Sequence, residues 1–204
     1  MLIDLNDLDE SSKIYSDICI IGSGVAGSIL AKELIKTKNR ITLIESGDLK
    51  PNELAQSLNQ VTHVGVPFRK NFHNRVRQYG GACNIWPGRM MVYDRDDVVG
   101  RTWINESSWD IDYDDLNYYL DLTGEKFGIP NMDYIKPEFW NNKFSHTEKL
   151  LFNNEYLKPT VALWAKNIPR FGSTSNFYKN LIKADNLIIY TNATATEIEL
   201  NEPK

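Results

Sequence analysis

A glycine-rich turn near the N-terminus carries the first chemical signal. The string GSGVAG begins at Gly22 and has the GxGxxG spacing. In such a turn Gly22 permits a tight bend, Gly24 lets a diphosphate approach the backbone, and Gly27 lets the following helix lie close to the preceding strand. Val25 and Ala26 stand at the start of that helix, where free N–H groups and the helix dipole attract phosphate. The string by itself is weak because glycines cluster in many turns, so its neighbours must support it.

Those neighbours have the expected pattern. The apolar run at 17–21 and the run ITLIE at 41–45 each predict a buried parallel strand. Apolar residues between them recur at spacings of three and four, which predicts a helix packed on a sheet. Its inward face is predicted to hold Ala26, Ile29, Leu30, Ala31, Glu33 and Leu34. Strand, glycine turn, helix and strand form the βαβ opening of a Rossmann-like, doubly wound α/β sheet.

An acidic residue closes the second predicted strand. Glu45 lies about 20 residues beyond the turn, where a carboxylate can accept hydrogen bonds from the ribose hydroxyls of adenosine. We assign Ser46 to the same site. A carboxylate at this place disfavours the 2′-phosphate of NADP, but it does not separate FAD from NAD. A Gly turn in an unrelated α/β protein is the plainer alternative.

A second glycine motif follows about thirty residues later, in the run RQYGGACNIWPGR that starts at Arg77. Gly80 and Gly81 allow backbone conformations and close approaches that side chains would block, as a dinucleotide lying along the chain requires. A simple hairpin turn is the alternative. Arg77 is a secondary candidate because a guanidinium can pair with a phosphate through two hydrogen bonds, although it could equally be a solvated surface side chain.

Three segments together resemble the glucose-methanol-choline (GMC) oxidoreductase family. They are GGACNIWPGRMMVYDRDDV from Gly80, WDIDYDDL from Trp109, and NLIIYTNATATEI from Asn186. The resemblance implies an N-terminal FAD-binding part of an enzyme that oxidises CH–OH groups of an alcohol or sugar by hydride transfer to flavin. It assigns Gly80, Gly81, Asn84 and Trp86 to the cofactor and Ala195 to an adenine contact.

The chain also departs from the family pattern at the covalent-attachment position and at the catalytic histidine. Some family members attach FAD covalently through a His in the glycine-pair segment, whereas Ile85 stands at the matching position here, so we expect non-covalent FAD. The family's catalytic His lies downstream of everything matched in this chain. His63, His73 and His146 fall outside any matching motif, so we assign no catalytic residue and no metal ligand.

The missing base leaves several functions open. The chain could be an N-terminal fragment, which we favour, or half of a split enzyme completed by a second polypeptide. It could also be an FAD-binding module without turnover. A nicotinamide-dependent dehydrogenase shares the βαβ opening, but such an enzyme would not explain GGACNIW.

Charge and hydropathy argue against a nucleic-acid-binding protein and against a membrane-spanning one. The net charge of −4 over 204 residues argues against a nucleic-acid partner. No apolar run approaches the ~18 residues that span a bilayer, and the acidic start does not resemble a signal peptide. We therefore expect a cytoplasmic protein; a small-molecule alcohol or sugar substrate is what the resemblance implies.

The chain divides into three segments in this interpretation. Residues 1–95 begin the FAD-binding domain, residues 96–172 form an irregular, partly helical insertion toward the substrate side, and residues 173–204 return to the first domain. Within the insertion, Asp112 and Asp114 are expected to cap a helix. Its inward face is predicted to hold Leu116, Tyr119, Leu120 and Phe127. Segment 186–200 predicts one or two strands.

Overall fold

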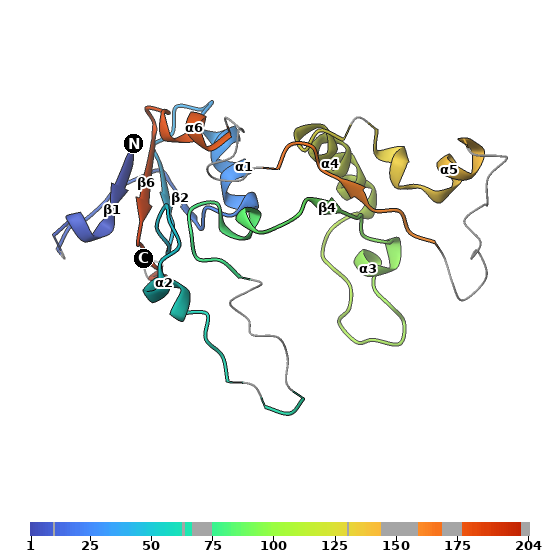
Figure 1. Cartoon of the computed structure of the whole chain (residues 1–204), viewed down its shortest axis with the longest axis horizontal. Helices are drawn as coiled ribbons and strands as arrows, with labels where there is room; N and C mark the ends of the chain where they lie inside the picture. Colours follow the sequence, from blue (N-terminus) through green and yellow to red (C-terminus); the bar gives the residue numbers. More distant parts are fainter. Residues whose placement is uncertain are drawn as a thin grey trace. The chain divides into compact units, whose positions relative to one another are not determined.

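The computed structural model describes residues 1–9, 11–62, 64–66, 75–129, 131–143, 159–168 and 177–200. The chain forms two compact units, Met1–Trp86 with Pro169–Lys204, and Pro87–Ile168 (Figure 1). In the described ranges no helix is long and apolar enough to cross a membrane. All three histidines lie outside these ranges.

The first unit contains a sheet flanked by short helices. Its elements are β1 (Leu2–Asp4), η1 (Leu5–Asp7), β2 (Ile18–Ile21), α1 (Val25–Leu34), β3 (Ile41–Ile44), α2 (Glu53–Ser57), η3 (Gly81–Asn84), α6 (Phe177–Ile182) and β6 (Leu187–Thr191). The four strands are parallel and lie in the order β1-β6-β3-β2. The chain is therefore a mixed α/β protein, and the predicted β2-α1-β3 unit is present with its strands paired side by side. The N-terminal strand β1 was not predicted.

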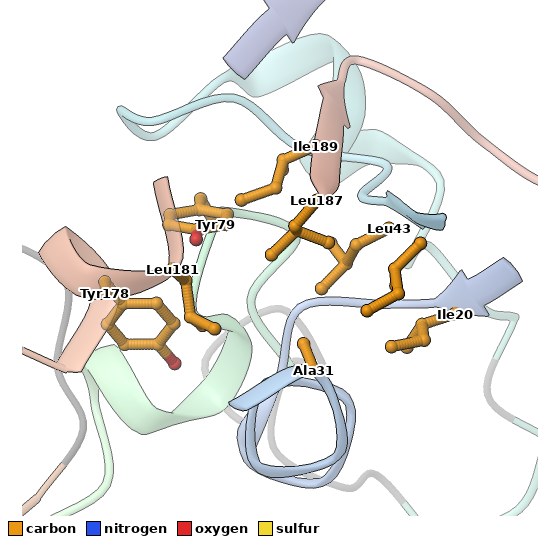
Figure 2. Packing of buried hydrophobic residues seen from close by; sticks show 9 residues of the cluster. Ile20, Ala31, Leu43, Tyr79, Tyr178, Leu181, Leu187 and Ile189 are labelled. Atoms are coloured by element: carbon orange, nitrogen blue, oxygen red, sulfur yellow. The ribbon is translucent and has the colours of Figure 1, made fainter. Parts of the chain in front are cut away.

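The core of this unit lies where the sheet meets α1 and α6. Strand register places Leu2, Ile189, Leu43 and Ile20 in one row and Leu187, Ile41 and Ile18 in the next. Figure 2 shows labelled side chains from β2, β3 and β6 gathered with Ala31 of α1 and with Leu181 and Tyr178 of α6. Leu43, Leu187 and Ile189 have no exposed surface, and each fully buried aliphatic side chain stabilises the fold by about 1.5–3 kcal/mol.

Helix α1 packs through small residues. Ser28 and Ala31 are its buried residues, whereas Leu30 is 49% exposed and Ala26 is also exposed. The predicted inward face is therefore wrong at Leu30 and Ala26. The close approach of the helix to the sheet brings the small residues inward and turns the larger Leu30 to solvent.

Strand β2 forms one edge of the sheet. Its residues alternate, so Ile20 is buried while Cys19 and Ile21 are exposed, Ile21 by 59%. The prediction of a fully buried strand at 17–21 is therefore wrong for one face. Strand β3 is interior, and its first three residues are all buried, as predicted for a strand covered on both sides.

The second unit is mostly helical. It contains β4 (Arg89–Met90), α3 (Arg95–Val99), α4 (Tyr113–Lys126), η4 (Met132–Ile135), α5 (Pro137–Lys143) and β5 (Leu163–Trp164), with β4 and β5 paired antiparallel. Asp112 caps α4 as predicted, because its carboxylate accepts hydrogen bonds from the backbone N–H groups of Asp114 and Asp115. A capping role for the Asp114 side chain is not seen.

The inward face of α4 is partly as predicted. Phe127 is buried and Leu116 and Leu120 are half-buried, but Tyr119 is 61% exposed, so that prediction is wrong. The buried position is Gly124 instead, which continues the i, i+4 series through Leu116 and Leu120. Tyr119 lies off that stripe, where its ring meets Tyr118 edge to face.

Candidate functional site

Three connections meet at the carboxyl edge of the parallel sheet. The Gly22 N–H donates to the Ile44 carbonyl at 2.7 Å, which ties the glycine turn to the end of β3. The N–H groups of Asn192 and Ala193, just after β6, donate to the carbonyls of Gly47 and Glu45 at 3.0 and 2.8 Å. This edge, where neighbouring strands end together, is where open α/β sheets bind ligands.

The glycine turn has the tight bend predicted at Gly22 and the close packing predicted at Gly27. Gly22 has φ +91°, which a side chain would strain. A Cβ on Gly27 would lie 2.0 Å from the Gly22 carbonyl oxygen, so the close packing expected at Gly27 is present. A Cβ on Gly24 would meet nothing within 4 Å. Gly24 is also the N-cap of α1 and supplies no side-chain hydrogen bond to its first turn, which begins at Val25.

Glu45 fastens the turn to the loop after β3. Its Oε2 accepts hydrogen bonds from the Ser23 N–H at 2.9 Å and the Ser23 hydroxyl at 2.6 Å. Its Oε1 accepts from the Gly47 N–H at 2.9 Å and, at 3.4 Å, from the Ser46 hydroxyl. A carboxylate oxygen has two lone pairs, so a further donor would reach Oε1 only in place of the long bond from Ser46. Glu45 is only 5% exposed, and its carboxylate connects the glycine turn to the loop after β3 through these hydrogen bonds.

The two glycine motifs are in contact, although 57 residues separate Ser23 from Gly80. The Gly80 N–H donates to the Ser23 hydroxyl at 2.9 Å. A Cβ on Gly81 would stand 3.0 Å from the Gly24 Cα, a contact tighter than side chains ordinarily make, so glycine favours this approach. Gly80 and Gly81 have φ values of +94° and +55° and lead into η3, so the segment is not a simple hairpin turn.

Arg77 and Asn84 hold the second motif in place. The Arg77 guanidinium donates from Nε to the Asn59 side chain at 2.8 Å and from Nη1 to the Ser46 hydroxyl at 3.0 Å. Arg77 is half-buried, so the solvated alternative is wrong. The Asn84 amide donates to the Tyr79 carbonyl at 3.0 Å and closes its own turn.

Two residues that sequence reasoning missed lie behind the turn. The Ser28 hydroxyl donates to the Ser23 carbonyl at 2.6 Å, and the Tyr178 hydroxyl makes a long hydrogen bond of 3.5 Å to the same oxygen. Burial raises the pKa of Tyr178 to about 12. Tyr178 also meets Tyr79 edge to face, with ring centroids 5.0 Å apart. Burial raises the pKa of Tyr79 well above its usual value.

The positions of Ile85, Trp86 and Ala195 are given by their exposure and their place along the chain. Ile85 is 49% exposed directly after η3, and Trp86 is half-buried. Ala195 is exposed and follows the end of β6 by four residues. Segment 192–200 contains no strand, so the second of the two possible strands is absent and Ala195 lies in irregular chain.

The residues present fit the diphosphate end of an adenine dinucleotide. An open approach at Gly24 and a helix start without a side-chain cap provide the space and the N–H donors that an anion needs. At Glu45 a ribose hydroxyl would take the place of the long bond from the Ser46 hydroxyl to Oε1. No protein-family model matches the chain, and no curated protein is found as a relative.

Proposed function

We propose that the chain binds FAD non-covalently at this edge of the sheet and is the front part of a flavin-dependent oxidoreductase acting on alcohols or sugars. The observation that carries the proposal is the contact between the two glycine motifs, through the bond from Gly80 to Ser23 and the close approach of Gly81 to Gly24. A GxGxxG turn alone suits any dinucleotide. The contact brings together the two segments that the resemblance to GMC oxidoreductases assigns to the cofactor.

The chain's residues would divide the binding between them. Gly24 and the first turn of α1 would receive the diphosphate, and Glu45 would accept a hydrogen bond from a ribose hydroxyl. Gly80, Gly81, Asn84 and Trp86 would border the flavin side. Flavin, when bound, would accept a hydride from the CH–OH carbon of the substrate. We assign no base in this chain, so turnover would require groups supplied from elsewhere.

The competing nicotinamide proposal makes a different prediction for the same experiment. The purified chain is incubated separately with FAD and NAD, passed through a desalting column, and examined by absorption spectroscopy. Our proposal predicts a yellow protein that retains FAD at one molecule per chain and does not retain NAD. Retention of NAD with no retention of FAD would favour the dehydrogenase, and retention of neither would refute dinucleotide binding.

Turnover is tested separately from binding. The FAD-loaded chain is mixed with simple alcohols and sugars under anaerobic conditions, and bleaching of the flavin absorption is followed. We expect no bleaching by the chain alone, because no general base is assigned in it. Bleaching would contradict the expectation that turnover requires groups supplied from elsewhere.

A further inference from the structure

The hydroxyl of Ser23 joins the two glycine motifs. It is completely buried and has partners from two distant parts of the sequence. It donates to Glu45 Oε2 at 2.6 Å and accepts from the Gly80 N–H at 2.9 Å. A hydroxyl has one proton and two lone pairs, and an amide N–H can only donate, so this direction of the hydrogen bonds is fixed.

Helix α1, which follows the turn, contains a matched serine that lacks this connection. Ser28 is also completely buried, and its hydroxyl donates to the Ser23 carbonyl at 2.6 Å. The Tyr178 hydroxyl lies against the same carbonyl, at 3.5 Å. Removing the Ser28 hydroxyl therefore loosens the rear of the turn, whereas removing the Ser23 hydroxyl separates Glu45 from Gly80.

We infer that Ser23 is a positioning residue that couples the ribose-side carboxylate to the second glycine motif. This inference rests on the proposed function, because it assumes that both partners border the nucleotide. Without the hydroxyl, the buried Gly80 N–H loses its acceptor and Glu45 loses one of its donors. Gly80 then shifts, and Gly81 no longer packs against Gly24. The bound nucleotide loses the contacts that the second glycine motif would make with it.

The coupling can also be broken from the other end. In Glu45→Gln the side chain has one oxygen and one NH₂ group. The Ser23 donors are directed at Oε2 and the Gly47 N–H at Oε1, so in either orientation of the amide at least one donor faces the NH₂ group. A disturbance at residue 45 should therefore reach the Gly80 amide through Ser23.

The test uses the full 204-residue chain as wild type, Ser23→Ala, Ser28→Ala and Glu45→Gln. Two quantities are measured: the Kd for FAD, from the change in flavin fluorescence, and the exchange rate of the Gly80 amide without ligand, from ¹H–¹⁵N NMR. We expect Ser23→Ala to weaken FAD binding about tenfold and to speed Gly80 exchange by a similar factor, as loss of a buried hydrogen bond implies. Glu45→Gln should also speed Gly80 exchange, and Ser28→Ala should change Kd by less than about twofold.

Three outcomes would overturn the inference. The first is a Ser23→Ala chain with wild-type Gly80 exchange. The second is equal loss of affinity in Ser28→Ala and Ser23→Ala, because the effect would then be general loosening of the turn. The third applies if Ser23→Ala does not fold, in which case unchanged Gly80 exchange in Glu45→Gln decides against the coupling. If the wild type binds no FAD, the proposed function fails, and the exchange rates still test the connection by themselves.

Discussion

Gly24→Ala should separate nucleotide binding from folding. Gly24 has φ −60° and ψ −177°, a conformation that any residue adopts. A Cβ built there meets nothing within 4 Å. The substitution therefore needs no movement of the surrounding atoms, and we expect the free energy of unfolding to change by about 0.5 kcal/mol or less. A small gain would be no surprise, because alanine restricts the unfolded chain.

The same methyl group should obstruct the ligand. It occupies the space through which a diphosphate would reach the N–H groups at the start of α1. A hydrogen bond to a charged group contributes about 1.5–3 kcal/mol, so losing one corresponds to roughly a 10- to 100-fold weaker Kd for FAD. This loss should appear in a chain whose stability is unchanged.

The assay combines urea denaturation with an FAD titration on the same preparation. Agreement requires an unchanged urea midpoint together with weaker binding of both FAD and ADP, since the obstruction concerns the diphosphate that they share. An alanine variant that binds FAD as tightly as the wild type would refute the placement of the diphosphate at Gly24. A large loss of stability would instead show that a methyl group at residue 24 meets neighbouring atoms.

Three further expectations concern the fold that supports the site. Gly27→Ala should lower the free energy of unfolding, measured by urea denaturation, by about 3 kcal/mol or more. The reason is that the new Cβ would lie 2.0 Å from the Gly22 carbonyl oxygen. A variant with nearly wild-type stability would contradict this close packing. Leu187→Ala should lower the free energy of unfolding by about 2–5 kcal/mol. Leu54 is 80% exposed, so Leu54→Ala should change it by no more than about 0.5 kcal/mol. Equal losses in the two variants would refute the assigned core. In alkali, unfolded tyrosine ionises near pH 10 while burial holds the pKa of Tyr178 near 12, so the free energy of unfolding should fall as pH rises from 10 to 12. Tyr178→Phe should make that fall less steep in urea titrations across this range, and an identical slope would show that Tyr178 ionises equally in both states.

The β2-α1-β3 unit could be predicted because its signals are local. Alternating strand and helix periodicity and a glycine turn lie within about thirty residues, so short-range pattern determines them. Strand β1 has only three residues, and its pattern of apolar and polar residues does not differ from that of the residues that follow it. It is defined by pairing with β6, where Leu2 lies beside Ile189, and no local pattern encodes a partner so far along the chain.

Helix faces were less predictable than helix positions. Periodicity located α1 and α4, but it favoured the large side chains of Leu30 and Tyr119 over small neighbours. The structure reverses that preference, because the buried residues include Ala31 in α1 and Gly124 in α4. Small residues at helical spacing were the signal available in the sequence.

The candidate site was predicted as two motifs but not as one contact. The GxGxxG pattern leaves its second position undefined, so Ser23 carried no weight, although its hydroxyl bonds both Glu45 and Gly80. Arg77 was considered for a phosphate, yet its guanidinium bonds Asn59 and Ser46. Both roles depend on which segments meet in space, and residue types alone do not specify that.

The most direct test of the central claim is the footprint of FAD on amide hydrogen exchange. The full chain is compared by mass spectrometry with and without FAD. We expect slower exchange in peptides covering Gly22–Gly27 and Gly80–Asn84 together, with peptides from α4 unchanged. Bound FAD that protects neither glycine motif, or only the first, would contradict a site formed where the two meet.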